Sequence, residues 1–335
     1  MDIVQLLLAL VLILLAAELF TNSLEHLGDR LGLSEGVTGS IFAAVGTALP
    51  ETMVPLVAVF ASSSLASPQV GEEVGVGAIL GAPMMLSTLT LFLMSLFAAK
   101  QRGWLGTLTP ERSGLRRDLS WFLAAFFLAT VALFIPHHGS AIRGAIAIVL
   151  VLFYFFYLLL TLRASAALVA DGHQTEAEAA LYLTRLGLPD WLLVILLQLG
   201  LGLAGIIYGA ELFVHGVEHL SKLFGISALL LSLLIVPIAT ELPEKINSIL
   251  WIRRKKDTLA FGNITGALVF QGSLLPAIGV SLTPWTPTAP VLVGALLTLT
   301  AGAYTLILAL RSHPLRPVHF VLNGALYGIY FVIIS

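Results

Sequence analysis

The amino-acid sequence is dominated by apolar runs of about the length that crosses a lipid bilayer. A spanning helix needs about 20 mostly apolar residues, and ten segments of the chain meet this description. They cover residues 3–28, 35–62, 74–98, 118–136, 140–163, 189–222, 226–252, 257–281, 288–311 and 316–334. The chain is 11% charged, whereas soluble domains carry about 25% charged residues. The sequence therefore predicts an all-α integral membrane protein with ten transmembrane helices.

The basic residues predict how these helices are oriented. When the loops are assigned alternately to two sides, most of the 17 Lys and Arg residues fall on one side. That side holds Arg30, Lys100, Arg102, Arg112, Arg116, Arg117, Arg163, Arg185, Arg253, Arg254, Lys255, Lys256, Arg311 and Arg316. The exceptions are Arg143, Lys222 and Lys245. Because basic loops stay in the cytoplasm, we expect both termini on the non-cytoplasmic side of a plasma (inner) membrane.

An internal repeat predicts how the chain is organised. Residues 17–20 (Ala-Glu-Leu-Phe) recur at 210–213. At the same offset, with no insertion or deletion, further identical residues follow as far as Glu51 and Glu244. We expect a first five-helix repeat at 1–163, a cytoplasmic linker at 164–188 and a second five-helix repeat at 189–335. An odd number of helices in each repeat forces the second copy to enter the membrane from the opposite side. Inverted repeats of this kind are typical of secondary transporters.

Two of the predicted helices carry the same proline-centred pattern of oxygen-bearing residues. Residues 46–51 read Gly-Thr-Ala-Leu-Pro-Glu, and residues 239–245 read Ala-Thr-Glu-Leu-Pro-Glu-Lys. A proline inside a helix frees a backbone carbonyl one turn earlier, and such carbonyls are tolerated at membrane depth only inside protein or beside a wet cavity. Carbonyl, Thr hydroxyl and Glu carboxylate oxygens form a ligand set suited to Na⁺ or Ca²⁺. Inverted symmetry would bring the two copies together near the bilayer centre.

The two glutamates of this pattern, Glu51 and Glu244, are the main candidate cation ligands. An ionisable side chain within a span costs about 2.5–3.5 kcal/mol on insertion scales, and two at one repeat position are hard to explain as packing. Thr47 and Thr240 are candidates as well. For them a purely structural role stays open, because Thr beside Pro in a membrane helix often only satisfies the freed backbone.

Other acidic residues leave alternatives open. Glu241 has no counterpart in the first repeat, where Ala48 stands. It could be a third site carboxylate, or it could pair with Lys245 one helical turn further on, which is the favoured interpretation. Glu18 and Glu211 also recur, but they lie towards the ends of long spans, where solvation at the interface is the favoured account.

Composition and motifs exclude several function classes. The formal net charge is −2, so no global basic field suggests a nucleic-acid partner. The chain has no cysteine, which excludes disulfides, thiolate metal sites and cysteine nucleophiles. There is no P-loop, H-E-x-x-H or G-x-S-x-G motif. We therefore expect no enzyme activity and no cofactor, and we expect inorganic cations and membrane lipid as partners.

At these residues the chain resembles the calcium/cation antiporter superfamily, which includes the sodium/calcium exchangers. The resemblance covers essentially the whole chain and implies ten helices in two inverted repeats. It places Glu51 and Glu244 at the family's ion-binding glutamates, and Thr47 and Thr240 at its threonine ligands. Residues 262–266 (Gly-Asn-Ile-Thr-Gly) keep the start of the family's second motif.

The chain departs from the family pattern at several ligand positions. The family's serine before the proline, its second motif serine and its terminal Asn or Asp are replaced in both repeats by Ala48, Glu241, Ala82, Ala267, Leu86 and Gln271. Several oxygen ligands are therefore missing, while Glu241 and Gln271 are new polar groups. Ca²⁺ prefers about six to eight oxygens, so the site could instead favour protons or a monovalent ion.

Together these features predict a secondary active cation antiporter that works by alternating access. Glu51 and Glu244 would bind the ion, which could be Ca²⁺, Na⁺ or H⁺, and Thr47 and Thr240 would complete the shell. Gln271 would add an oxygen and Glu241 would tune the charge. Two alternatives stay open: a proton-coupled carrier of another cation, and a non-transporting membrane protein that has kept the fold.

Overall fold

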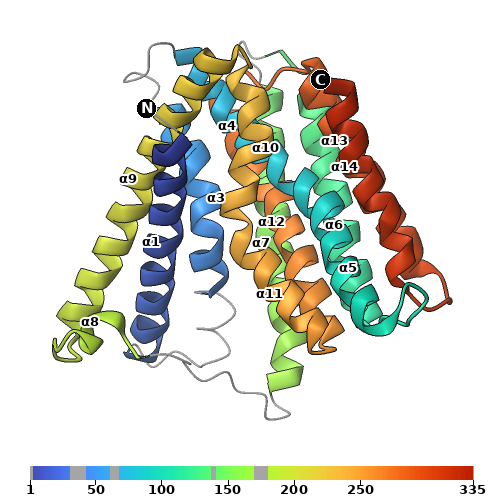
Figure 1. The fold of residues 1–335 in the computed structure, drawn as a ribbon, viewed down its shortest axis with the longest axis horizontal. Helices are drawn as coiled ribbons and strands as arrows, with labels where there is room; N and C mark the ends of the chain where they lie inside the picture. The colour runs from blue at the N-terminus through green and yellow to red at the C-terminus, as the bar shows by residue number, and fades with distance from the viewer. Residues whose placement is uncertain (1–2, 31–42, 61–67, 137–140, 170–179, 335) are drawn as a thin grey trace. The chain divides into compact units, whose positions relative to one another are not determined.

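The computed structural model of the chain describes residues 3–30, 43–60, 68–136, 141–169 and 180–334 (Figure 1). Apart from one isolated antiparallel bridge between Leu108 and Leu315, regular structure in these ranges is helical. The helices are α1 (Ile3–Arg30), α3 (Ala43–Phe60), α4 (Pro68–Met85), the π-helical η3 (Leu86–Thr90), α5 (Leu91–Arg102), α6 (Arg112–Ala132), α7 (Ala141–Val169), α8 (Tyr182–Arg185), α9 (Leu192–Phe224), α10 (Ala228–Thr240), α11 (Leu242–Arg253), α12 (Asp257–Leu282), α13 (Ala289–Leu310), the 3₁₀-helical η4 (Pro317–Phe320) and α14 (Val321–Ile334).

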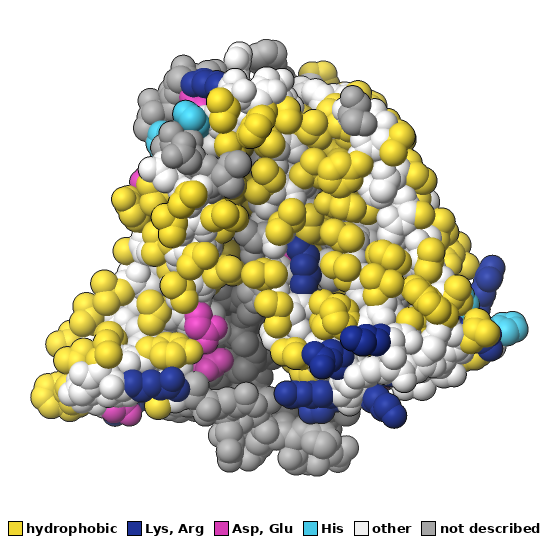
Figure 2. Space-filling model, viewed as in Figure 1, with side chains coloured by type: hydrophobic (Ala, Val, Ile, Leu, Met, Phe, Trp, Pro, Cys, Tyr) yellow, Lys and Arg dark blue, Asp and Glu magenta, His cyan; other side chains and the backbone are white. Residues whose placement is uncertain are grey.

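Seven helical stretches in the described ranges are long and apolar enough to cross a membrane. They are Val4–Leu27, Gln69–Arg102, Ala141–Thr161, Leu192–Phe224, Asp257–Leu282, Ala289–Leu310 and Pro317–Ile334. This confirms the all-helical membrane class. Each of the ten predicted segments overlaps a helix, but a count of ten crossings stays a prediction. Hydrophobic side chains cover much of the visible face of each part of the molecule (Figure 2).

The chain forms two compact units that combine segments from both predicted repeats. Unit 1 consists of 1–71 and 156–226, and unit 2 of 72–155 and 227–335. Each unit therefore draws on both halves of the sequence, so the spatial division does not follow the division into repeats. The predicted linker at 164–188 is partly helical, because α7 continues to Val169 and α8 follows.

Unit 1 is built on the close antiparallel pair α1 and α9 (Figure 1). Glycines on α9 make the close approach possible. A methyl group at Gly202 would lie 2.8 Å from the backbone nitrogen of Phe20, and one at Gly216 would lie 2.9 Å from Leu6. Residues later in α9 contact residues earlier in α1, so the two helices run in opposite directions. Small residues of this kind let membrane helices approach closely without a hydrophobic driving force.

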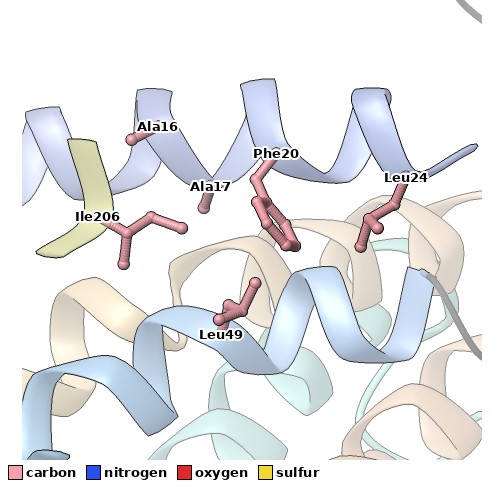
Figure 3. Packing of buried hydrophobic residues seen from close by; sticks show 6 residues of the cluster. All are labelled: Ala16, Ala17, Phe20, Leu24, Leu49 and Ile206. Carbon is pink, nitrogen blue, oxygen red and sulfur yellow. The ribbon is translucent and has the colours of Figure 1, made fainter. Parts of the chain in front are cut away.

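Helix α3 packs against this pair through an apolar cluster (Figure 3). The buried members are Ala16, Ala17, Phe20, Leu24, Leu49 and Ile206, with Met53 packed beside them. Leu49 and Met53 are four residues apart, so they lie on the same side of α3. Two buried polar residues add specific contacts to the unit: Gln198 donates to Asn22 at 2.9 Å and to the carbonyl of Leu19 at 3.1 Å.

Unit 2 places α4 beside α10 and packs α11 against α5 and α12. A methyl group at Gly77 would lie 1.7 Å from Ser232 Oγ, and one at Gly81 would lie 2.3 Å from the carbonyl of Leu233. Residues later in α4 contact residues later in α10, so the two helices run parallel. The small residues Gly77 and Gly81 therefore allow a close helix contact.

A buried arginine in unit 2 explains one exception to the charge asymmetry. Arg143 is 4% exposed, and its guanidinium donates to the carbonyls of Val280, Thr283 and Pro284 at 2.7–2.8 Å. These carbonyls surround the C-terminal end of α12, where the helix dipole favours a positive charge. Arg143 therefore stabilises a helix end. This role does not depend on the side of the membrane on which Arg143 lies.

Candidate cation site

The second proline-centred motif lies where a helix of unit 2 is broken. α10 ends at Thr240 and α11 begins at Leu242, with Glu241 between them at φ −85° and ψ 6°. Pro243 has no N–H to donate to the preceding turn, so it weakens the helix at this point. The predicted span 226–252 is thus two helices joined at Glu241. The sequence predicted freed backbone groups here, whereas the full break at Glu241 is a finding of the structure.

Two buried carboxylates lie close together at this break. Glu241 is 0% exposed and Glu244 is 5% exposed, and they present carboxylate oxygens within 4.8 Å of each other. Gln271 of α12 donates from Nε2 to Glu241 Oε1 at 2.6 Å. Among the described residues, Glu241 Oε2, Glu244 Oε2 and Gln271 Oε1 are buried without a hydrogen-bond partner. Because buried polar atoms are nearly always satisfied, these three oxygens mark the candidate cation site.

Lys245 lies beside this pair of carboxylates and is itself 7% exposed. Its Nζ donates to the carbonyl of Pro237 at 2.6 Å and lies 2.8 Å from Met85 Sδ. Its charge interacts electrostatically with both Glu241 and Glu244. Glu241 accepts a hydrogen bond from Gln271 and interacts electrostatically with Lys245, and both interpretations of Glu241 stay open.

The remaining predicted ligands of unit 2 have local roles. Thr240 donates from Oγ1 to the carbonyl of Val236 at 3.2 Å, as a threonine near a proline kink is expected to do. Asn263 is a further residue beside the site, for whose side chain no role was predicted. Its Nδ2 donates to the backbone carbonyl of Glu244 at 3.1 Å and to Ser248 Oγ at 3.0 Å. Asn263 therefore joins α12 to α11 directly beside the site, and its place in the motif at 262–266 was the available signal.

The first proline-centred motif belongs to unit 1. Glu51 lies on α3 and is 5% exposed. It follows Leu49 by two residues, which places it about 200° around the helix from the side that packs on α1 and α9. The side chain of Thr47 is outside the described residues. Because Glu51 and Glu244 belong to different units, their meeting stays a prediction.

The recurring glutamates Glu18 and Glu211 lie well inside α1 and α9 and not towards the helix ends. Both are exposed on the surface of unit 1, and their solvation at the interface stays a prediction. Glu18 Oε1 accepts a hydrogen bond from the hydroxyl of Tyr182 at 2.8 Å. This bond to a carboxylate is the main reason why the pKa of Tyr182 is raised.

Known protein sequences match most of this chain. A sequence profile of the family described as "Sodium/calcium exchanger protein" matches residues 1–163 and 194–335. The protein named "Putative antiporter CaxA" of Alkalimonas amylolytica is 28% identical over 278 residues, which are 83% of this chain and 80% of that protein.

Two solved structures have a similar fold. The H⁺/Ca²⁺ exchanger CAX has a TM-score of 0.64 at 18% identity, covering 98% of this chain and 86% of the other. The sodium-calcium exchanger NCX_Mj has a TM-score of 0.58 at 20% identity, covering 99% of this chain and 97% of the other. At this level of identity the likeness concerns the fold alone.

Proposed function

Since the chain belongs to the sodium/calcium exchanger protein family, we propose that it is a secondary active antiporter whose ion is bound by the carboxylates of Glu51 and Glu244. It is an integral membrane transporter and not an enzyme. The finer assignment includes Thr47 and Thr240 as further ligands and ten transmembrane helices in two inverted repeats. It also includes an inner-membrane location with both termini on the non-cytoplasmic side.

The observation that carries this proposal is the group of buried oxygens in unit 2. Glu241 and Glu244 are carboxylates at a helix break, and one oxygen of each is without a hydrogen-bond partner among the described residues. The side-chain oxygen of Gln271 is in the same state. Carboxylate, amide and carbonyl oxygens are hard ligands that suit alkali and alkaline-earth cations. Such buried and ionisable groups inside a membrane protein typically line an ion pathway.

Exchange follows if two ions compete for the same carboxylates. When one cation must leave before the other binds, net movement of one is coupled to movement of the other. Alternating access requires that a part of the protein moves around the site. We propose that α1 and α9 move as one body, because their glycine-mediated packing leaves little freedom for one helix to slide without the other.

The test is cation exchange by the purified protein in proteoliposomes. Glu244→Gln and Glu51→Gln should each abolish exchange, because an amide cannot supply the negative charge that binds the ion. Glu211→Gln is the matched control: it removes an exposed carboxylate from α9 and should leave exchange intact. Thermal melting in detergent establishes that each variant is folded.

The outcomes separate the open alternatives. Exchange that continues in both site variants would refute the proposed ligands. Flux that follows a pH gradient and ignores Na⁺ would identify the proton as the coupling ion. A wild-type protein with neither flux nor cation-dependent stabilisation would be a non-transporting member of the fold, since a ligand that binds only the folded state must raise the melting temperature.

A further inference from the structure

Lys245 is the one feature of the site that a simple cation-binding pocket does not need. It directly follows Glu244 in α11 and is buried. A lysine at membrane depth is costly to insert, so it is rarely kept without a function. Its ammonium group therefore has to be explained together with the carboxylates.

The ammonium group of Lys245 is held by two neighbours, one from α10 and one from α4. Its Nζ is held by the carbonyl oxygen of Pro237 at 2.6 Å and lies against Met85 Sδ. Electrostatic attraction to Glu241 and Glu244 adds to these contacts. Lys245 directly follows Glu244 and lies one helical turn after Glu241, to whose carbonyl its backbone N–H donates at 3.1 Å. Its positive charge therefore lies in the same part of unit 2 as the unpartnered carboxylate oxygens.

This arrangement changes the charge that a cargo ion meets. Glu241 and Glu244 supply two negative charges when both are ionised, and Lys245 supplies one positive charge, which leaves a net charge of −1 for this half of the site. Coulomb attraction scales with the charge of the ion. At the same distance, the ammonium group therefore repels a divalent ion twice as strongly as a monovalent ion.

We propose that Lys245 is a tethered cation that competes with the cargo for Glu241 and Glu244 and shifts the selectivity of the site from divalent towards monovalent ions. This inference rests on the proposed function, because it names the class of ion that the same site takes. A purely structural lysine would neutralise the carboxylates and support folding, but its removal would not change the order of ion preference.

The experiment compares wild type with Lys245→Gln and Lys245→Met by melting in detergent across a series of Na⁺, K⁺ and Ca²⁺ concentrations. Removing the ammonium should raise the ratio of Ca²⁺ to Na⁺ affinity by about tenfold or more. The reason is that Ca²⁺ is relieved of twice the repulsion that Na⁺ is relieved of. Lys256→Gln is the control: it removes the same charge from an exposed position after α11 and should leave the ratio unchanged.

The results distinguish this inference from the proposed function. If wild type responds to cations and both Lys245 variants keep the same ratio, only the inference is overturned. If neither wild type nor the variants respond to any cation, both are overturned.

If both variants fail to fold, wild-type protein labelled with ¹⁵N-lysine replaces them. The chain has only five lysines, and the Nζ signal of Lys245 should move on cation saturation while the others stay in place. A Lys245 signal that does not move overturns the inference.

Discussion

Two glycines of α9, Gly200 and Gly202, should respond in opposite directions to the same substitution. A methyl group at Gly202 would lie 2.8 Å from the backbone nitrogen and 2.9 Å from the Cα of Phe20. Backbone atoms cannot rotate away, so α1 and α9 would have to separate. At Gly200 nothing lies within 4 Å of the added methyl group, so Gly200→Ala introduces no clash.

The magnitude follows from two terms. Replacing Gly by Ala inside a helix gains up to about 1 kcal/mol through helix propensity, and both positions share this gain. Overpacking a close contact costs about 1–3 kcal/mol, and only Gly202 incurs this cost. The propensity term cancels in the comparison, so Gly202→Ala should be less stable than Gly200→Ala by about 1–3 kcal/mol.

The assay is thermal or denaturant unfolding of both variants beside wild type in the same detergent. Gly200→Ala should match or exceed wild type, and Gly202→Ala should fall below Gly200→Ala by the stated amount. Because α1 and α9 are proposed to move as one body, Gly202→Ala should also slow cation exchange. Equal stability of the two variants would refute the close packing of α1 on α9 as the basis of unit 1.

Two further predictions concern the site and the orientation. Gln271→Leu removes the donor to Glu241 and should lower the free energy of unfolding by about 2 kcal/mol, within the range for a hydrogen bond to a charged group. It should also weaken the stabilisation by cations. Melting curves identical to those of wild type, both with and without cations, would contradict this prediction. Because the chain has no cysteine, single cysteines can report its orientation: Ser312→Cys should react with an impermeant thiol reagent only after the membrane is opened, Thr286→Cys should react in intact cells, and the reverse pattern would invert the predicted orientation.

The helical framework could be predicted because length and apolarity alone define a membrane helix. Each of the ten predicted segments overlaps a helix with boundaries shifted by a few residues. The π-helical turn Leu86–Thr90 could not be predicted, because it arises inside an otherwise continuous apolar segment. The break at Glu241 was only partly predictable, since Pro243 can either kink a helix or end it.

Within the candidate site, the sequence identified the carboxylates but not their environment. Glu244 and Glu241 stand out because charge is rare in apolar helices. Met85, which lies against Lys245 Nζ, is 160 positions away in the chain and is an ordinary apolar residue in an apolar helix. Asn263 could be identified as part of a motif, but its bond to the carbonyl of Glu244 depends on how α12 packs on α11.

The departures from the exchanger pattern in the second repeat are physically linked. Where the resembled family has a serine, this chain has Glu241, which adds one buried negative charge. A buried carboxylate needs a donor and a compensating charge. Gln271, also a departure, supplies the donor at 2.6 Å, and Lys245 supplies a positive charge one turn further along the chain. The amide nitrogen of Gln271 is thus used to hold Glu241, which leaves its oxygen available to a cation. Glu241, Gln271 and Lys245 therefore form one linked group, in which the charge added by Glu241 is balanced within the same unit.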